Sequence, residues 1–154
     1  MADHHKYIRQ VIEIARSAHA NGNRPFGALL ISANGEALAS AENSQLTGEQ
    51  VLAHAEMVLL HDAVRQFSPD VLQGSTIYTS AEPCAMCAGA IFWSGVGRLV
   101  FGLSGEKLHQ LAGKSPDMLL ASSGDVLAQA GRKVEVVGPI LEDEAMDLFA
   151  NGVF

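Results

Sequence analysis

Short apolar segments of strand composition alternate along this chain with longer segments of helical periodicity, an order that few fold classes produce. The patterns predict helices at residues 3–20, 53–66, about 84–94, 106–112 and 140–150, and strands at residues 28–32, 36–41, 75–79, 98–102 and 133–137. Strands that alternate with helices favour an α/β fold with helices on both faces of one sheet. We therefore expect a three-layer α/β/α sandwich around a five-stranded mixed sheet.

Local patterns support these elements to different degrees. The apolar stripe of the first helix consists of Ile8, Val11, Ile12, Ala15 and Ala18. Asn34-Gly35 is a hairpin turn signal, so the first two strands should supply the antiparallel pair. In the second helix, Val58, Leu59 and Val64 are expected to face inward. Residues 103–131 are harder to assign, because a short helix gives way to a connection rich in Ser, Gly and Asp.

The length and hydropathy of the chain bound its organisation. Its 154 residues suit a single domain spanning residues 1–154. No apolar run approaches the roughly 18 residues that a membrane-spanning helix needs, and residues 1–10 lack the core of a signal peptide. We therefore expect a soluble, cytoplasmic protein that has no membrane partner.

The charge of the chain bears on its partners. The formal net charge is −7, and the ten Lys and Arg residues are scattered. Residues 140–154 contain Glu142, Asp143, Glu144 and Asp147 but no basic residue. Proteins that bind nucleic acids usually present a basic surface. We therefore expect a small molecule, rather than a nucleic acid, as the partner of this chain.

Cys84 and Cys87 are the only cysteines, and they follow Pro83. Two cysteines do not make a disulfide scaffold, and in a reducing compartment a close pair is more often catalytic or metal-binding. Pro83 opens a predicted helix, so both thiols lie near a helix N-terminus, which favours the thiolate. The pair alone leaves three interpretations open: a redox pair, half of a metal site, or two small core residues.

The helix predicted at 53–66 adds two polar groups, because His54 and Glu56 lie at its start. In α/β folds, ligands collect at the carboxyl ends of strands, where helix N-termini converge. His54, Cys84 and Cys87 offer one imidazole and two thiolates, a set that suits Zn²⁺ and leaves its fourth position for water. We therefore expect one catalytic zinc ion per chain. Glu56 would face the bound water; a capping or solvated glutamate is the alternative.

His54-Ala55-Glu56 followed by Pro83-Cys84-Ala85-Met86-Cys87 resembles the H-x-E…P-C-x-x-C signature of the zinc-dependent cytidine and deoxycytidylate deaminase superfamily. The resemblance covers about residues 7–137 and is nearest to guanine deaminases and tRNA adenosine deaminases. It implies a hydrolase of cyclic amidines in which Glu56 is the catalytic acid and base. It also implies that water activated by zinc replaces an amine of the substrate ring, with release of ammonia.

The resemblance also implies a set of substrate-binding residues: Asn43, Phe26, Ala55 and Trp93. Asn43 lies at the family's spacing before His54, and Phe26 and Trp93 resemble aromatic residues that line the pocket of guanine deaminases. Each has a structural alternative. In the structural interpretation, Asn43 is a turn residue. Phe26 is then a core residue, and Trp93 is a core or interface residue.

The identity of the substrate depends on a loop in which the chain departs from these relatives. Residues 50–54 read Gln-Val-Leu-Ala-His, where guanine and tRNA adenosine deaminases usually have Asp-Pro-Thr-Ala-His. Deamination of a free amino-heterocycle such as guanine is our first hypothesis, followed by tRNA adenosine and then by cytosine. A non-enzymatic zinc or redox module built on Cys-x-x-Cys is the alternative from another class.

Two further expectations concern the surroundings of the site. The helix at 84–94 is apolar enough to pack in the core or against a second subunit, and relatives of this size are usually dimers or larger. We therefore expect a homodimer. In the relatives the last helix or tail helps to cover the site, so Phe149 and Phe154 are candidates for a lid.

Overall fold

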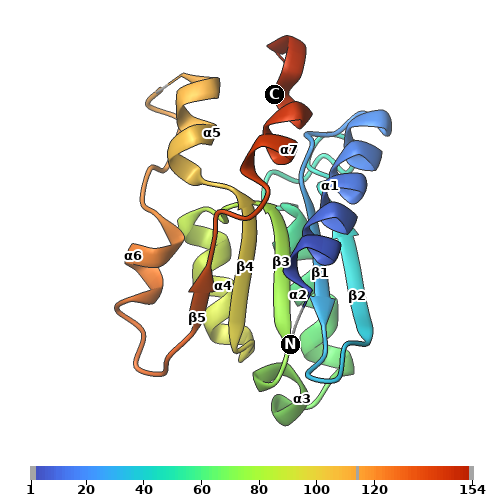
Figure 1. The fold of residues 1–154 in the computed structure, drawn as a ribbon, viewed down its shortest axis with the longest axis vertical. Coiled ribbons are helices and arrows are strands. Elements are labelled where there is room, and N and C mark those ends of the chain that lie inside the picture. Colours follow the sequence, from blue (N-terminus) through green and yellow to red (C-terminus); the bar gives the residue numbers. More distant parts are fainter. Residues whose placement is uncertain (1–2, 114, 153–154) are drawn as a thin grey trace.

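The computed structural model describes residues 3–113 and 115–152, which form one sheet flanked by helices (Figure 1). Within these residues the strands are β1 (Gly27–Ile31), β2 (Ala37–Glu42), β3 (Thr76–Ala81), β4 (Arg98–Leu103) and β5 (Glu135–Val137). The α-helices are α1 (His4–Ala20), α2 (Ala55–Gln66), α3 (Pro69–Gln73), α4 (Ala85–Ser94), α5 (Gly105–Ala112), α6 (Ser123–Leu127) and α7 (Glu142–Met146). A 3₁₀ helix, η1 (Asp147–Gly152), follows α7.

The sheet has the strand order β2-β1-β3-β4-β5. β1 pairs antiparallel with β2 and β3, whereas β3, β4 and β5 run parallel. The register places Leu30 opposite Ile77, Ile77 opposite Leu99, and Leu99 opposite Val136, so one apolar row crosses four strands. The predicted five-stranded mixed sheet, with its antiparallel hairpin, is confirmed in the described part of the chain.

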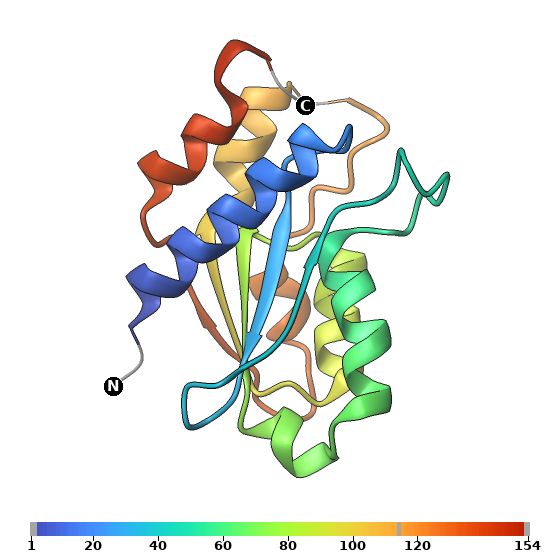
Figure 2. The same ribbon diagram turned by 90° about the vertical axis from the view of Figure 1, so that its right-hand side faces the viewer.

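Helices cover both faces of this sheet, as Figure 2 shows with the sheet seen nearly edge-on. Leu59 of α2, Ile91 of α4 and Leu127 of α6 belong to the apolar cluster on one face. Ile8 and Val11 of α1 belong to the cluster on the other. Because both faces are covered, β1, β3 and β4 are buried almost throughout, whereas the edge strand β2 is not. The expected three-layer α/β/α sandwich is confirmed.

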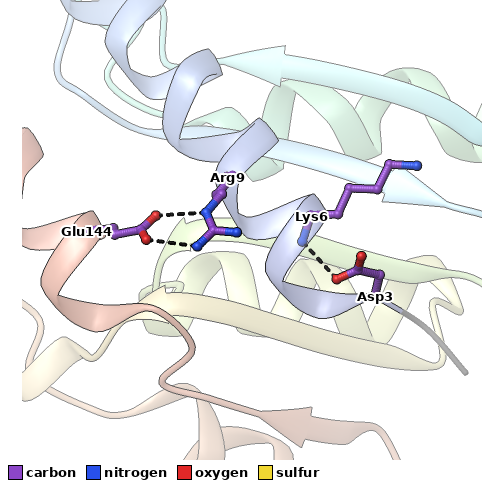
Figure 3. Close-up of polar contacts among 4 residues, drawn as sticks. All are labelled: Asp3, Lys6, Arg9 and Glu144. Atoms are coloured by element: carbon purple, nitrogen blue, oxygen red, sulfur yellow. Dashed lines mark hydrogen bonds and ion pairs between the residues drawn. The ribbon is translucent and has the colours of Figure 1, made fainter.

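A polar contact holds α7 beside α1 on the outer surface (Figure 3). Arg9 Nε and Nη2 donate to Glu144 Oε2 and Oε1, at 3.1 and 3.0 Å. At the start of α1, Asp3 Oδ1 caps the helix by accepting from Lys6 N at 3.1 Å. The paired bonds from Arg9 fix the orientation of the two helices. Because both side chains are exposed, their contribution to stability is small.

Several helices differ from the sequence-based expectation. The short helices α3 and α6 are not predicted, and each begins at a capping serine: Ser68 Oγ accepts from Val71 N, and Ser122 Oγ accepts from Asp125 N. The prediction for Val64 is wrong, because its side chain is exposed on α2. The predicted helix at 140–150 is α7 followed by η1, and it starts only at Glu142. No helix in residues 3–113 and 115–152 combines the length and apolar character needed to cross a bilayer.

Candidate active site

The starts of α2 and α4 meet at the edge of the sheet where β3 and β4 end. His54 is the N-cap residue of α2 and Cys84 that of α4, and both have extended backbones. Neither side chain caps its own helix, so the imidazole and the thiol can serve another partner. Cys87 lies one turn into α4 and is buried. Two helix starts therefore bring the three predicted zinc ligands together.

The spacing of these three side chains fits a zinc ion. His54 Nδ1 lies 3.7 Å from Cys84 Sγ and 3.5 Å from Cys87 Sγ. Zinc bonds of about 2.3 Å to sulfur and about 2.1 Å to nitrogen, at a tetrahedral angle, place the two ligand atoms about 3.6 Å apart. Among the residues described, no other three His, Cys, Asp or Glu side chains come together in this way. Three ligands leave one tetrahedral position for water.

Contacts within the group separate the pKa values of the two thiols. A hydrogen bond with Cys87, reinforced by one with His54, lowers the pKa of Cys84 to about 4. The same bond to Cys84, together with burial, raises the pKa of Cys87. The pKa of His54 is raised, chiefly by its hydrogen bond with Cys84. Cys84 is therefore a thiolate at neutral pH, whereas Cys87 gives up its proton when a metal binds.

Glu56 adds a buried carboxyl group to this arrangement. It is the second residue of α2 and only 6% exposed. Burial raises the pKa of Glu56, while a hydrogen bond with Cys87 and the charge of His54 act in the opposite direction. The carboxyl group thus lies against Cys87 without belonging to the three ligands. A carboxyl group whose pKa is raised in this way is suited to take up a proton and return it.

Asn43 and Phe26 lie next to each other where β1 begins and β2 ends, because Asn43 N donates to Phe26 O at 3.0 Å. Asn43 is 1% exposed. Its Oδ1 accepts from Gln45 N at 3.1 Å, and its Nδ2 donates to Gln45 Oε1 at 2.7 Å. The amide therefore completes a turn, and its nitrogen has a second N–H that is suited to a substrate contact. The predicted binding role of Asn43 stays a prediction.

Phe26 and Ala55 differ in how much surface they offer. The half-buried ring of Phe26 packs against Phe149 of η1, with 5.7 Å between the ring centroids. Ala55 is fully buried between the zinc ligand His54 and Glu56. Phe149 therefore adjoins a predicted substrate-binding residue, while Phe154 lies outside the described residues. The substrate contacts of Phe26 and Ala55 and the lid role of Phe149 stay predictions.

Trp93 is remote from the other site residues. It lies nine residues after Cys84 on α4, a rise of about 14 Å along the helix axis. Its side chain is 84% exposed and meets the ring of Phe92 edge-on, which excludes the core interpretation. One chain alone does not bring the indole to the zinc ligands, so a substrate contact by Trp93 requires a second subunit.

A cavity of about 360 Å³ opens beside Cys84, and it is lined by residues 82–84 before α4 and by residues from 105–110 and 119–122. Leu108 and His109 of α5 line one side, and Leu119 and Leu120 line the other. Sequence patterns do not identify these residues, because periodicity is weak over 103–131. A larger cavity of about 760 Å³ lies at the opposite edge of the sheet, at the starts of β3, β4 and β5. Ligand geometry, rather than size, therefore identifies the site.

Comparison with known proteins agrees with this geometry. Residues 1–103 match the family described as "Cytidine and deoxycytidylate deaminase zinc-binding region". The "Probable cytosine deaminase" of Schizosaccharomyces pombe is 42% identical over 142 residues, which are 91% of this chain and 86% of that protein. The tRNA-specific adenosine deaminase of Bacillus subtilis is 35% identical over 138 residues, 90% of this chain and 81% of the relative.

A solved structure supports the same assignment. The guanine deaminase from Nitrosomonas europaea matches with a TM-score of 0.75 and 28% identity, over 92% of this chain and 79% of that chain. The relatives share the hydrolytic, zinc-dependent chemistry that the resemblance implies, so the hypothesis of a non-enzymatic zinc or redox module is wrong. The matched segment contains Glu56 and all three zinc ligands. The chain belongs to the cytidine and deoxycytidylate deaminase family of zinc-dependent hydrolases.

Proposed function

We propose that this enzyme deaminates a free amino-heterocycle, with guanine as the first candidate, and releases ammonia. The observation that carries the proposal is the position of Glu56, whose buried carboxyl group lies against the ligand group of His54, Cys84 and Cys87. A proton-carrying group beside an open zinc position is what hydrolysis of a ring amine requires.

The chemistry divides between the metal and Glu56. A zinc ion held by His54, Cys84 and Cys87 supplies a Lewis acid that makes water nucleophilic at neutral pH. Glu56 accepts the two protons of the attacking water in turn, and delivers the first to the adjacent ring nitrogen and the second to the departing amine. A bond forms between the water oxygen and the ring carbon. The C–N bond breaks, its electron pair stays on nitrogen, and the nitrogen leaves as ammonia.

Three residues are assigned to the ring itself. Asn43 binds a polar edge of the ring through the second N–H of its amide, while the first stays bonded to Gln45. Phe26 presents a half-exposed aromatic face on which a flat ring can stack. Ala55 is assigned to the ring from its place between His54 and Glu56 in the motif, although its side chain is fully buried. Together these contacts orient the ring toward Glu56.

The likeness to the guanine deaminase of Nitrosomonas europaea supports guanine. A specific observation favours cytosine as a second candidate, because the Schizosaccharomyces pombe relative is 42% identical. The sequence of residues 50–54 also departs from the one usual in guanine deaminases. The relative from Bacillus subtilis acts on tRNA, but the net charge of −7 counts against binding of a folded RNA by this chain.

The test is an ammonia-release screen with the zinc-loaded protein. The substrates are guanine, cytosine, adenine, their nucleosides, amino-triazines and folded tRNA, and the Glu56→Gln variant reports background. Release from a free base, absent in the variant, is the expected result. Release from tRNA alone overturns the proposed substrate class, and no release from any substrate overturns the proposed function.

We infer that two copies of the chain associate through the exposed side of α4, where Trp93 is 84% exposed. A large exposed aromatic side chain of this kind is typical of interfaces between subunits. The free thiols of Cys84 and Cys87 suit a reducing compartment, which supports a cytoplasmic location.

A further inference from the structure

Glu82, which lies between the end of β3 and the zinc ligand Cys84, joins three distant parts of the chain. Its Oε1 accepts from Gly105 N, the first residue of α5, at 2.9 Å. Its Oε2 accepts from the backbone N of Ser123, the first residue of α6, at 2.9 Å, and from Ser123 Oγ at 2.7 Å. One carboxylate therefore connects the starts of two helices to the residues that precede the metal ligand.

The surroundings of Glu82 restrict the position of its backbone and of its carboxylate. Ser123 is fully buried, and the backbone N of Glu82 donates to Leu103 O at 2.7 Å. Gly105 has no side chain, and a Cβ at that position would lie 3.3 Å from Glu82 Oε1. The start of α5 therefore approaches the carboxylate as closely as backbone can. Hydrogen bonds from N–H and O–H donors to a carboxylate are about twice as strong as neutral ones.

The segments that Glu82 holds are the walls of the 360 Å³ cavity beside Cys84. α5 supplies Leu108 and His109 to one wall, and Leu119 and Leu120 precede Ser123 on the other. Glu82 itself lines the cavity and precedes Cys84 by two residues. Bonds to this carboxylate therefore help to set the distance from each wall to the metal ligand.

We propose that Glu82 is a positioning residue that holds both walls of this cavity in register with the zinc ligand Cys84 and thereby sets the affinity for the substrate. It acts through α5 and residues 119–123 rather than on the reacting atoms. The inference rests on the proposed function, because the effect on KM requires a substrate that binds in this cavity.

Glu82→Gln is the direct test, because it replaces one carboxylate oxygen by an NH₂ group that meets an N–H donor. Misplacement of the walls should raise KM on the order of tenfold and change kcat by less than about threefold. Zinc should remain at one ion per chain. Amide hydrogen exchange should become faster over residues 105–108 and 119–124.

Glu142→Gln is the matched control. Glu142 Oε2 accepts from Ser104 N at 2.8 Å, and Ser104 precedes Gly105. The substitution therefore makes the same chemical change to a carboxylate that holds the start of α5 but does not line the cavity. Its melting temperature should fall by an amount similar to that of Glu82→Gln, while KM stays within about twofold, because Glu82 still holds both walls. If Glu82→Gln does not fold, Ser123→Ala removes one donor and should raise KM about threefold.

The outcomes separate the two proposals. KM and exchange rates that match between Glu82→Gln and Glu142→Gln overturn the positioning role, as does a fall in kcat that tracks loss of zinc. If the wild-type enzyme turns over no substrate in the screen, the proposed function fails by itself. Amide exchange then decides the positioning role: acceleration over 119–124 in Glu82→Gln but not in Glu142→Gln supports it, and equal rates overturn it.

Discussion

Glu56 is predicted to act in catalysis without binding the metal, and a substitution can separate the two properties. The Glu56→Gln variant should keep one zinc ion per chain, because the amide leaves His54, Cys84 and Cys87 unchanged. Its kcat should fall by about 10²–10⁴-fold, the usual contribution of general acid–base catalysis. Metal analysis and ammonia release on the same sample measure both quantities. The exposed Glu13→Gln serves as the control, and a Glu56→Gln enzyme of normal kcat would contradict the assignment.

Substitution of Cys87 tests the metal site through a predicted ligand. Its thiol is buried, and its pKa is raised by the hydrogen bond to Cys84 and by burial, so its proton is lost more readily when a cation binds. Cys87→Ala should therefore lower zinc affinity by at least about 100-fold. Competition with a chromophoric chelator measures the affinity, and circular dichroism checks that the fold persists. Full zinc occupancy in this variant would remove Cys87 from the ligand set.

At the residue scale, the sequence predicts the cluster of His54, Cys84 and Cys87, whereas the surroundings of Asn43 and Trp93 emerge only from the structure. His54, Cys84 and Cys87 can be found because residues at helix starts meet at the carboxyl edge of the sheet. The turn that Asn43 makes with Gln45 and the outward direction of Trp93 are different, because they depend on packing between elements. No local pattern in the sequence carries that information.

At the scale of elements, the same dependence on packing explains why the structure of residues 103–131 is hard to predict from the sequence. The five predicted strands and the longer helices have apolar periodicity over enough residues to be recognised. α6 has five residues, and its start is determined by the cap at Ser122 and by the bonds from Ser123 to Glu82. The cap is a local signal, but a lone serine is too common to identify a helix. The bonds to Glu82 span 41 residues and exist only in the folded chain.

Arg132 stabilises the end of α4 that lies away from the zinc site. It donates from Nη1 to Val96 O at 3.0 Å and from Nη2 to Ile91 O and Phe92 O, and its guanidinium lies 5.0 Å from the centre of the Phe92 ring. Arg132→Met keeps an apolar stem but leaves these carbonyl groups without a charged donor. It should lower the free energy of unfolding by about 2 kcal/mol.

Thermal unfolding measures this effect of Arg132→Met. In a chain of this size, a loss of about 2 kcal/mol lowers the melting temperature by roughly 4–8 °C. Arg16→Met is the control, because the ion pair of Arg16 with Glu13 is exposed and its loss should change the melting temperature little. Equal melting temperatures for the two variants would show that the bonds from Arg132 do not support α4.

At the scale of the whole molecule, chemistry is concentrated at one edge of the sheet, and α4 reaches away from that edge. Its first residues follow the ligand Cys84, and its last turn carries the exposed Trp93. An interface on this helix would connect the subunit contact directly to the metal site. It would also explain why the indole is exposed to solvent, whereas the other Phe and Tyr rings in the described residues are buried or half-buried.

Trp93→Glu tests that arrangement. The wild-type chain should sediment as a dimer at micromolar concentration, and a charge in place of the indole should weaken the dimer by at least about 30-fold, as expected for an aromatic residue at the centre of an interface. Val64→Glu, at another exposed apolar residue, on α2, should leave the dimer intact. If Trp93 also completes the partner's pocket, Trp93→Phe should keep the dimer and raise KM. A wild-type monomer under these conditions would leave the exposed indole without a partner and would remove Trp93 from the substrate site, because a single chain holds it at the far end of α4.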